Sequence, residues 1–390
     1  MVKILHQIFV RVWTKKNIPI SWRFARIKLL AKSVDTSHPS LMRPISVLNV
    51  EGRIFFTIYQ RRISTYLIDN NYIQKKVQKG FINGVAGCIE HTTLTHETLQ
   101  NAKKHQRSIC ASWVDLKNAY GTIRHMQLQY ALKRYHVPQE ICKLVFNYYE
   151  GLFGKVVTKD WSSSWFSFEI GLFQGCTAST INFDIAFQPL LDIVTTLTGD
   201  MGYDFKEANL RVPPLVYADD VEFLTSTTAQ NSTYLNSLQT ALEWSQTMQE
   251  NPSKCRSLAF NLFKNKKSTA KVLPTLYSCF DPLLQIANQK IPFIGNDNPP
   301  CYKYLGRWIQ HDLKDNWVRE TFKTKLEKWL EVVDKTLLTG PMKAWIANHH
   351  VCSKATWTLM IYDFPESEAK EWQSIVRRYW KIVNHQSHGA

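Results

Sequence analysis

The sequence predicts a mixed α/β protein with two or three packed subdomains. The chain is 390 residues long, and one domain usually takes about 100 to 200 residues. Hydrophobic residues make up 44% of the chain and charged residues 21%, which excludes a disordered, collagen-like or disulfide-scaffold protein. Short apolar runs of strand length alternate with longer segments of helical spacing, and this alternation predicts sheets covered by helices.

A small α/β unit is predicted near the N-terminus. Two short strands are expected at Ile27–Ala31 and Arg43–Leu48, because both runs are apolar and bounded by turn-forming residues. Glu51–Ile68 then carries apolar side chains three and four residues apart, which is the spacing of a helix.

Three further strands are predicted around acidic residues. The apolar run Ile109–Val114 is typical of a buried strand, and it ends on Asp115. The runs Leu215–Ala218 and Val221–Leu224 flank the pair Asp219-Asp220, which is typical of a hairpin with the acidic pair at or near its turn. The sequence therefore places carboxylates at the ends of strands in two separate parts of the chain.

Helical spacing also marks the middle and the C-terminal part of the chain. Pro138 stands at the first turn of one predicted helix, and Thr177–Val194 is a second, strongly apolar one. Residues 311–390 are expected to be largely helical, with an apolar face that runs from Val318 to Leu337.

The net charge predicts a polyanionic partner. Lys and Arg number 48 against 32 Asp and Glu, a formal charge of +16. Nucleic acid is the first candidate and an anionic membrane surface the second. No run of 18 uncharged apolar residues occurs, so we expect no membrane span.

The eight cysteines predict a reduced setting. They are scattered along the chain and include no CxxC pair, which argues against zinc ribbons and thioredoxin-like sites. We therefore expect an intracellular protein, in the nucleus and cytoplasm if the host is eukaryotic.

The acidic residues at the strand ends are the candidate metal ligands. Taken singly, Asp115 or the pair Asp219-Asp220 is more often a turn former or helix cap than a metal ligand. Together, a lone aspartate and an aspartate pair at adjacent strand ends suit Mg²⁺, which prefers carboxylate oxygens. Two such ions activate a hydroxyl nucleophile and neutralise the leaving group of a phosphoryl displacement. This chemistry is nucleotidyl transfer.

Seven motifs, in the order expected of one family, support this interpretation. The chain resembles the reverse transcriptases, and among them those of non-LTR (LINE-type) retrotransposons. The resemblance spans residues 20 to 306. The motifs are Arg43–Ser46, Gln78–Phe81, Val114–Tyr120, Gly171–Ser179, Tyr217–Asp220, Asn251–Lys254 and Tyr304–Gly306.

The resemblance implies an α/β (α+β) right-hand polymerase with three subdomains. The fingers would comprise residues 1–108 with part of 125–165. The palm would comprise residues 109–310 with the catalytic motifs, and the helical thumb residues 311–390.

The resemblance also implies a role for each site residue. Asp115, Asp219 and Asp220 would be the catalytic residues and hold two Mg²⁺ ions, with Mn²⁺ as a substitute; Asp220 would mainly shape the field beside the other two. The residues implied to contact the incoming dNTP are Lys32, Arg43, Tyr120, Gln174, Gly175 and Lys254. The implied primer grip is Tyr304, Leu305 and Gly306.

The implied activity is that of an RNA-directed DNA polymerase, and its partners would be an RNA template, a DNA primer, their hybrid and dNTPs. An RNA-dependent RNA polymerase is one alternative, against which the aromatic Tyr120 argues because that position must then admit a 2′-hydroxyl. A non-catalytic nucleic-acid-binding scaffold is another, against which the three aspartates argue. The chain is either a fragment of a larger polyprotein or the product of a solitary gene. Most of its 13 tryptophans are expected in the core. One of those after residue 310 could instead stack on nucleic acid.

Overall fold

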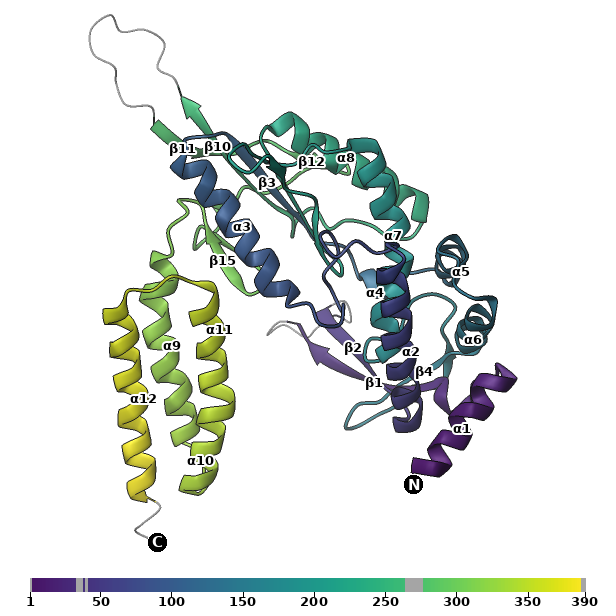
Figure 1. The fold of residues 1–390 in the computed structure, drawn as a ribbon. Helices are drawn as coiled ribbons and strands as arrows, with labels where there is room; N and C mark the ends of the chain where they lie inside the picture. Colours follow the sequence, from purple (N-terminus) through teal and green to yellow (C-terminus); the bar gives the residue numbers. More distant parts are fainter. Residues whose placement is uncertain (1, 33–37, 39–40, 264–275, 387–390) are drawn as a thin grey trace, which may run out of the picture. The chain divides into compact units, whose positions relative to one another are not determined.

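The chain folds into two compact units of mixed helix and sheet (Figure 1). The structure is a computed structural model that describes residues 2–32, 38, 41–263 and 276–386. The first unit comprises Met1–Gly87, Ile109–Ser257 and Pro282–Pro292, and the second comprises Cys88–Ser108, Leu258–Asp281 and Phe293–Ala390. Because these units interleave along the chain, the expected boundaries of fingers, palm and thumb stay a prediction.

The first unit contains a four-stranded sheet in the order β2-β1-β4-β5. Strands β1 (Phe24–Ala31) and β2 (Met42–Val47) are antiparallel, and Leu30 pairs with Arg43. Strand β4 (Phe153–Val156) runs parallel to β1, and β5 (Phe166–Ser167) completes the sheet. The two strands predicted here are confirmed, the first beginning three residues earlier than expected.

The aspartates lie on a second sheet, in which β3 pairs with β9 and β9 with β8. Strand β3 (Ile109–Val114) has the predicted bounds and is buried along its whole length. It pairs antiparallel with β9 (Asp220–Thr225), which forms a hairpin with β8 (Leu215–Tyr217). Strands β10 (Arg256–Phe263) and β11 (Leu276–Phe280) pair with each other antiparallel.

Helix α7 (Thr177–Thr198) is the central helix of the first unit. It packs against α2 (Val50–Asp69), α5 (His125–Arg134) and α8 (Thr228–Ser245). Such an environment explains why α7 is apolar on nearly all sides. The unit also contains α1 (Val2–Lys15), α4 (Ala119–Thr122), α6 (Gln139–Tyr149), β6 (Asp204–Phe205), β7 (Leu210–Arg211), β12 (Gln285–Ile286) and β13 (Gln289–Lys290).

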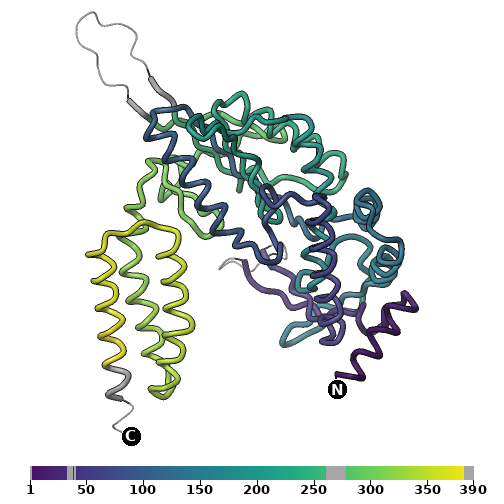
Figure 2. Tube along the Cα trace, in the orientation of Figure 1, coloured from purple at the N-terminus to yellow at the C-terminus, as the bar shows by residue number. Residues whose placement is uncertain are grey.

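The second unit combines one long helix, one hairpin and a helical bundle. Helix α3 spans Gly87–Lys104, and the hairpin consists of β14 (Cys301–Tyr304) and β15 (Arg307–Gln310). In Figure 2 the helical segments 316–334, 340–361 and 366–386 run side by side. They are α9 (Asn316–Asp334), α10 (Gly340–Ile346), α11 (Ser353–Ile361) and α12 (Glu366–Gln386), with a π-helical turn at Ala347–Cys352.

The core of the bundle follows the apolar face predicted from the sequence, except at its end. Phe322, Leu326 and Val333 are buried on α9 and pack around Trp372 of α12. The expectation for Leu337 is wrong: its side chain is fully exposed, because α9 ends at Asp334 and the helical spacing stops there. Across the described residues, no helix is long and apolar enough to cross a membrane.

Candidate active site

The structure brings the three aspartates together at the end of β3 and the turn between β8 and β9. Asp115 directly follows Val114, which pairs with Val221 in the antiparallel register. One step further along this register, Asp115 lies level with Asp220. Asp219 precedes Asp220 in the tight turn, where Ala218 adopts a left-handed conformation with φ of 56°.

Burial and mutual repulsion disfavour the charged forms of these carboxylates. Burial raises the pKa of all three, and for Asp220 the charges of Asp219 and Asp115 add to it and bring the pKa to about 7. Three neighbouring negative charges in a half-buried site need a cation to offset them.

Basic side chains supply part of this compensation. The charges of Lys254 and Lys32 act against the rise in the pKa of Asp115. The charge of Arg43 acts in the same way on the pKa of Asp219. The structure thus brings three of the predicted dNTP-binding residues close enough to the aspartates to act on them electrostatically, within the first unit.

The aspartates fit a divalent cation that is shared with a substrate. In the part of the chain that the structure describes, no group of three His, Cys, Asp or Glu side chains is arranged as a ready-made metal site. Mg²⁺ does not need one, because it is usually held by one or two carboxylates together with substrate phosphates. Asp115 and Asp219 offer these carboxylates, and their mutual repulsion favours a cation between them.

Gln78 holds the turn that carries Asp219. Its Oε1 accepts hydrogen bonds from the backbone N–H groups of Ala218 and Gly80, both at 2.8 Å, and its Nε2 donates to the carbonyl of Ala218 at 3.3 Å. Gly80 lies against the same turn: a Cβ added there would be 2.3 Å from the backbone nitrogen of Ala218. Both residues belong to a motif of the sequence, but their role in holding this turn was not predicted.

Asn251 supports Asp115 in a similar way. Its Nδ2 donates to Oδ2 of Asp115 at 3.2 Å, and its backbone N–H donates to the carbonyl of Asp115 at 2.8 Å. The backbone N–H of Lys254 donates to the carbonyl of Asn251, which places this exposed lysine beside the aspartate. The motif Asn251–Lys254 therefore forms a short turn against the end of β3.

Gln174 and Gly175 lie just before helix α7 and contact strand β2. The carbonyl of Gln174 accepts a 2.6 Å hydrogen bond from the backbone N–H of Ser46. Gly175 has a φ of +118°, and a Cβ there would lie 2.5 Å from the carbonyl oxygen of Ser46. The tight packing of two backbone segments is thus sufficient to require glycine, and the expected contact of both residues with a nucleotide stays a prediction.

Tyr120 packs against α7 with its hydroxyl unsatisfied. Its ring stacks on Phe183 at 4.7 Å, and among the described residues its hydroxyl has no hydrogen-bond partner. The neighbouring residue Asp184 is 1% exposed, and neither of its carboxylate oxygens has a partner there. Burial, with the charge of Asp219, raises the pKa of Asp184 well above its usual value. Sequence reasoning missed Asp184, although an aspartate inside an apolar helical run was a signal.

A comparison with known families decides the assignment. A family model described as reverse transcriptase (RNA-dependent DNA polymerase) matches residues 31–309, which is more than half of the 390 residues. The chain belongs to the reverse transcriptase family. Its members generally use divalent metal ions, and the right-hand polymerase fold predicted from the sequence is confirmed by this membership.

This reverse transcriptase is similar in sequence to retrotransposon proteins. It is 29% identical over 211 residues to "Retrovirus-related Pol polyprotein from type-2 retrotransposable element R2DM" of Drosophila melanogaster, covering 54% of this chain and 19% of that protein. It is 25% identical over 305 residues to "Retrovirus-related Pol polyprotein from type-1 retrotransposable element R2" of Nasonia vitripennis, covering 77% and 27%. The resemblance to non-LTR retrotransposon reverse transcriptases is confirmed, and the chain spans about a fifth to a quarter of the length of these relatives.

Telomerase structures are also similar. Truncated apo telomerase from Candida tropicalis has a TM-score of 0.44 at 14% identity, covering 70% of this chain and 56% of that one. Telomerase from Candida albicans with a fragment of telomeric RNA has a TM-score of 0.45 at 12% identity, covering 97% and 62%.

The predicted primer grip forms the turn of the β14–β15 hairpin. Tyr304 pairs with Arg307, and between them Leu305 and Gly306 have φ values of 42° and 92°. Positive φ at both central residues matches the two-residue turn that suits the twist of a hairpin. The hairpin belongs to the second unit of the reverse transcriptase chain, and its contact with a primer stays a prediction.

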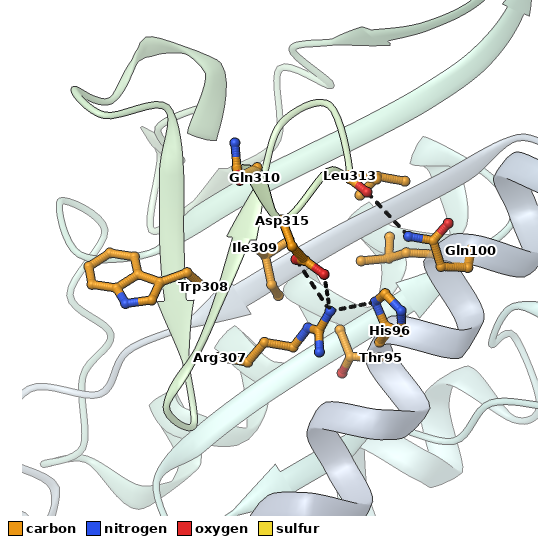
Figure 3. A pocket seen from close by; sticks show the side chains of 10 residues that line it. Thr95, His96, Gln100, Arg307, Trp308, Ile309, Gln310, Leu313 and Asp315 are labelled. Atoms are coloured by element: carbon orange, nitrogen blue, oxygen red, sulfur yellow. Dashed lines mark hydrogen bonds and ion pairs between the residues drawn. The ribbon is translucent and has the colours of Figure 1, made fainter. Parts of the chain in front are cut away.

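A buried arginine anchors this hairpin to helix α3 (Figure 3). Arg307 is 4% exposed and donates hydrogen bonds to Asp315 at 3.1 Å and to Nδ1 of His96 at 2.8 Å. Gln100 of the same helix donates to the carbonyl of Leu313 at 3.2 Å. Sequence reasoning missed this network, since none of its members belongs to a motif.

His96 should make the stability of the protein depend on pH. Burial and the charge of Arg307 lower its pKa to about 4. The unfolded chain then binds more protons than the folded one between about pH 6.5 and pH 4, so stability falls as the pH drops through this range. Acidification therefore lowers the free energy of unfolding. We expect His96→Gln to make this decrease smaller by on the order of 1 kcal/mol, allowing for the partial exposure of the ring. Urea unfolding of both proteins at pH 7 and pH 4.5 measures the difference.

The exposed His350 of the second unit provides the matched control. His350→Gln should leave the pH dependence of unfolding as it is in the wild type. Equal pH dependence in the wild type and His96→Gln would contradict the role of His96.

Proposed function

We propose that this chain extends the 3′-hydroxyl of a DNA primer with dNTPs on an RNA template. The observation that carries the proposal is the cluster of Asp115, Asp219 and Asp220, in which burial, together with the charges of the other two carboxylates, raises the pKa of Asp220 to about 7. The turn that carries the cluster is held in place by Gln78 and Gly80. Such a cluster has no structural benefit of its own and is explained by the cations of nucleotidyl transfer.

Each residue of the site has a task in this reaction. Asp115 and Asp219 would hold two Mg²⁺ ions, which supply activation of the primer hydroxyl and neutralisation of the leaving group. Asp220 keeps the local potential negative. Arg43 suits bidentate contact with the triphosphate, whereas Lys32 offers a point charge. Lys254, whose charge acts on Asp115, would give a proton to the departing pyrophosphate.

A primer-extension assay tests the proposal. The full chain is given an oligo(dT) primer on poly(rA) with Mg²⁺ and dTTP, and parallel reactions receive UTP, a DNA template or EDTA. We expect extension with dTTP on the RNA template, and none with EDTA. Extension with UTP at a similar rate would favour an RNA polymerase, and tight binding of the duplex without extension would favour a non-catalytic scaffold.

Tyr120 should exclude ribonucleotides by occupying the space beside the sugar. Tyr120→Ala keeps the aspartates intact, so dGTP incorporation should stay within about tenfold of wild type, about 1.4 kcal/mol. Incorporation of GTP relative to dGTP should rise by more than tenfold, because the ring no longer blocks a 2′-hydroxyl. Steady-state kcat/KM for the two nucleotides measures this selectivity.

Tyr120→Phe is the matched control, since it keeps the ring on Phe183 and removes only a hydroxyl that has no partner among the described residues. It should retain the selectivity of the wild type. If Tyr120→Ala instead loses both activities equally and unfolds at lower temperature, the ring is a core element and the role as a gate is wrong.

A further inference from the structure

Aromatic and basic side chains together line a groove of the second unit. The groove has a volume of about 620 Å³ and lies between the β14–β15 hairpin and helices α9 and α11. This volume falls within the usual range for ligand sites, about 300 to 1,000 Å³. We call it the lysine–tryptophan groove, after Lys303, Lys325, Lys354, Trp308, Trp329 and Trp357, which line it.

The lysines of the groove carry uncompensated positive charge. In the described part of the chain, none of the three forms an ion pair with a carboxylate. Burial and the charge of Lys303 lower the pKa of Lys325. Other lysines of the same unit do have carboxylate partners, as Lys323 has in Glu371. An anion in the groove would therefore be stabilised.

The tryptophans offer ring surface for stacking. All three are half-buried. Lysine ammonium groups lie over two of these rings, Lys303 at 5.8 Å from the centre of Trp308 and Lys354 at 5.4 Å from that of Trp329. A flexible lysine over a ring is easily replaced by a flat base, after which its ammonium group is free to meet a phosphate.

The third ring packs against the hairpin. A Cβ at Gly306 would lie 2.7 Å from Nε1 of Trp357, so the turn of the hairpin packs directly on this indole. The ring of Trp308 packs edge-on against Trp317 at 4.9 Å, and Lys325 lies 4.6 Å from the centre of Trp317. Rings that are held in place before binding lose little entropy when a ligand stacks on them.

We propose that the lysine–tryptophan groove binds an unpaired stretch of polynucleotide, with bases stacked on the tryptophans and phosphates paired with the lysines. Unpaired bases fit better than a duplex, because base pairing hides the faces that would stack on the rings. An acidic peptide would use the lysines and leave the rings without a partner. The proposal goes beyond the polymerase reaction, since none of the residues predicted to hold the cations or the dNTP lines the groove, although Gly306 of the predicted primer grip does.

Binding of short oligonucleotides to the full chain tests the proposal. The variant Lys303→Ala/Lys354→Ala removes two exposed lysines of the groove, and Lys328→Ala/Lys381→Ala removes two exposed lysines of the same unit outside it. Fluorescence anisotropy is measured with a 12-nucleotide single-stranded RNA, the matching single-stranded DNA and a 12-base-pair hybrid duplex. The RNA and DNA arms show which kind of strand the groove prefers.

The groove variant should bind the single strands about twentyfold more weakly at 0.1 M salt. Two lost phosphate contacts should also make the slope of log K against log salt shallower by about 1.4, at about 0.7 per phosphate of a single strand. Its affinity for the duplex should fall no further than that of the control variant. Equal losses for single strand and duplex, or equal losses in both variants, would overturn the proposal.

Photo-crosslinking tests the stacking directly. A single strand that carries 5-iodouridine should crosslink to peptides that contain Trp308, Trp329 or Trp357, and the duplex should compete poorly. Crosslinks that map only to other peptides would show that the rings do not stack on bases. Both experiments leave the aspartates unchanged, so their failure can be told apart from a failure of primer extension.

Discussion

Asp219→Asn should reduce primer extension by at least about 10⁴-fold, and Asp115→Asn should do the same. Each change keeps the shape of the side chain and removes the charge that would hold a cation. A loss of about 5.4 kcal/mol of transition-state stabilisation corresponds to this factor. Binding of an RNA/DNA duplex should stay within about threefold of wild type, because it depends on the basic surface of a chain with a formal charge of +16.

Asp160→Asn is the matched control, since Asp160 is an exposed aspartate of the same unit. It should retain wild-type extension. Single-turnover extension at saturating dNTP measures all three variants. The Asp115 and Asp219 variants should also be at least as stable as wild type, because each removes one of the charges that raise the pKa of Asp220. Extension above a tenth of wild type in both variants would refute the catalytic assignment.

Gly80→Ala should lower primer extension by about 100-fold or more. The new Cβ would lie 2.3 Å from the backbone nitrogen of Ala218 and 2.9 Å from its Cα, so the turn that carries Asp219 has to move. A displacement of about 1 Å at a catalytic group is enough to cost about 10²-fold in rate. The same overpacking should lower the free energy of unfolding by about 1 to 3 kcal/mol. Extension is therefore measured well below the unfolding temperature of the variant.

Gly84→Ala separates this effect from general backbone strain. Gly84 has a φ of +74° with nothing within 4 Å of an added Cβ, so alanine there strains the backbone without touching the turn. It should lose stability and keep extension within about threefold of wild type at a permissive temperature. Equal extension by Gly80→Ala and Gly84→Ala would contradict the proposed contact with the catalytic turn.

The elements that the sequence predicted best are those whose pattern is local. Strand β3 has the expected bounds because the run Ile109–Val114, apolar except at Ser112, is bounded by polar residues. The hairpin at Asp219-Asp220 was predictable because two apolar runs flank a turn-forming pair. The apolar face of α9 was predictable up to Val333 and wrong at Leu337, because spacing alone does not show where a helix ends.

The sequence by itself determined the mixed α/β class, the positive charge and the order of motifs that leads to three aspartates. All of these follow from composition or from residues within a few positions of one another. Only the tertiary structure decided the contacts between residues far apart in the chain. Gln78 forms a hydrogen bond with Ala218, 140 positions away in the sequence, and Arg307 with His96, 211 positions away.

The same holds for the lysine–tryptophan groove, whose residues come from a hairpin and two helices. Whether such residues meet depends on how strands and helices pack against each other, and packing minimises exposed apolar surface and unsatisfied polar groups over the whole fold. The spacing of apolar residues indicates the periodicity of a single helix or strand, but it does not show which other elements pack against it. For this reason the sequence indicated the chemistry of the aspartates, whereas the residues that position them became visible only in the folded chain.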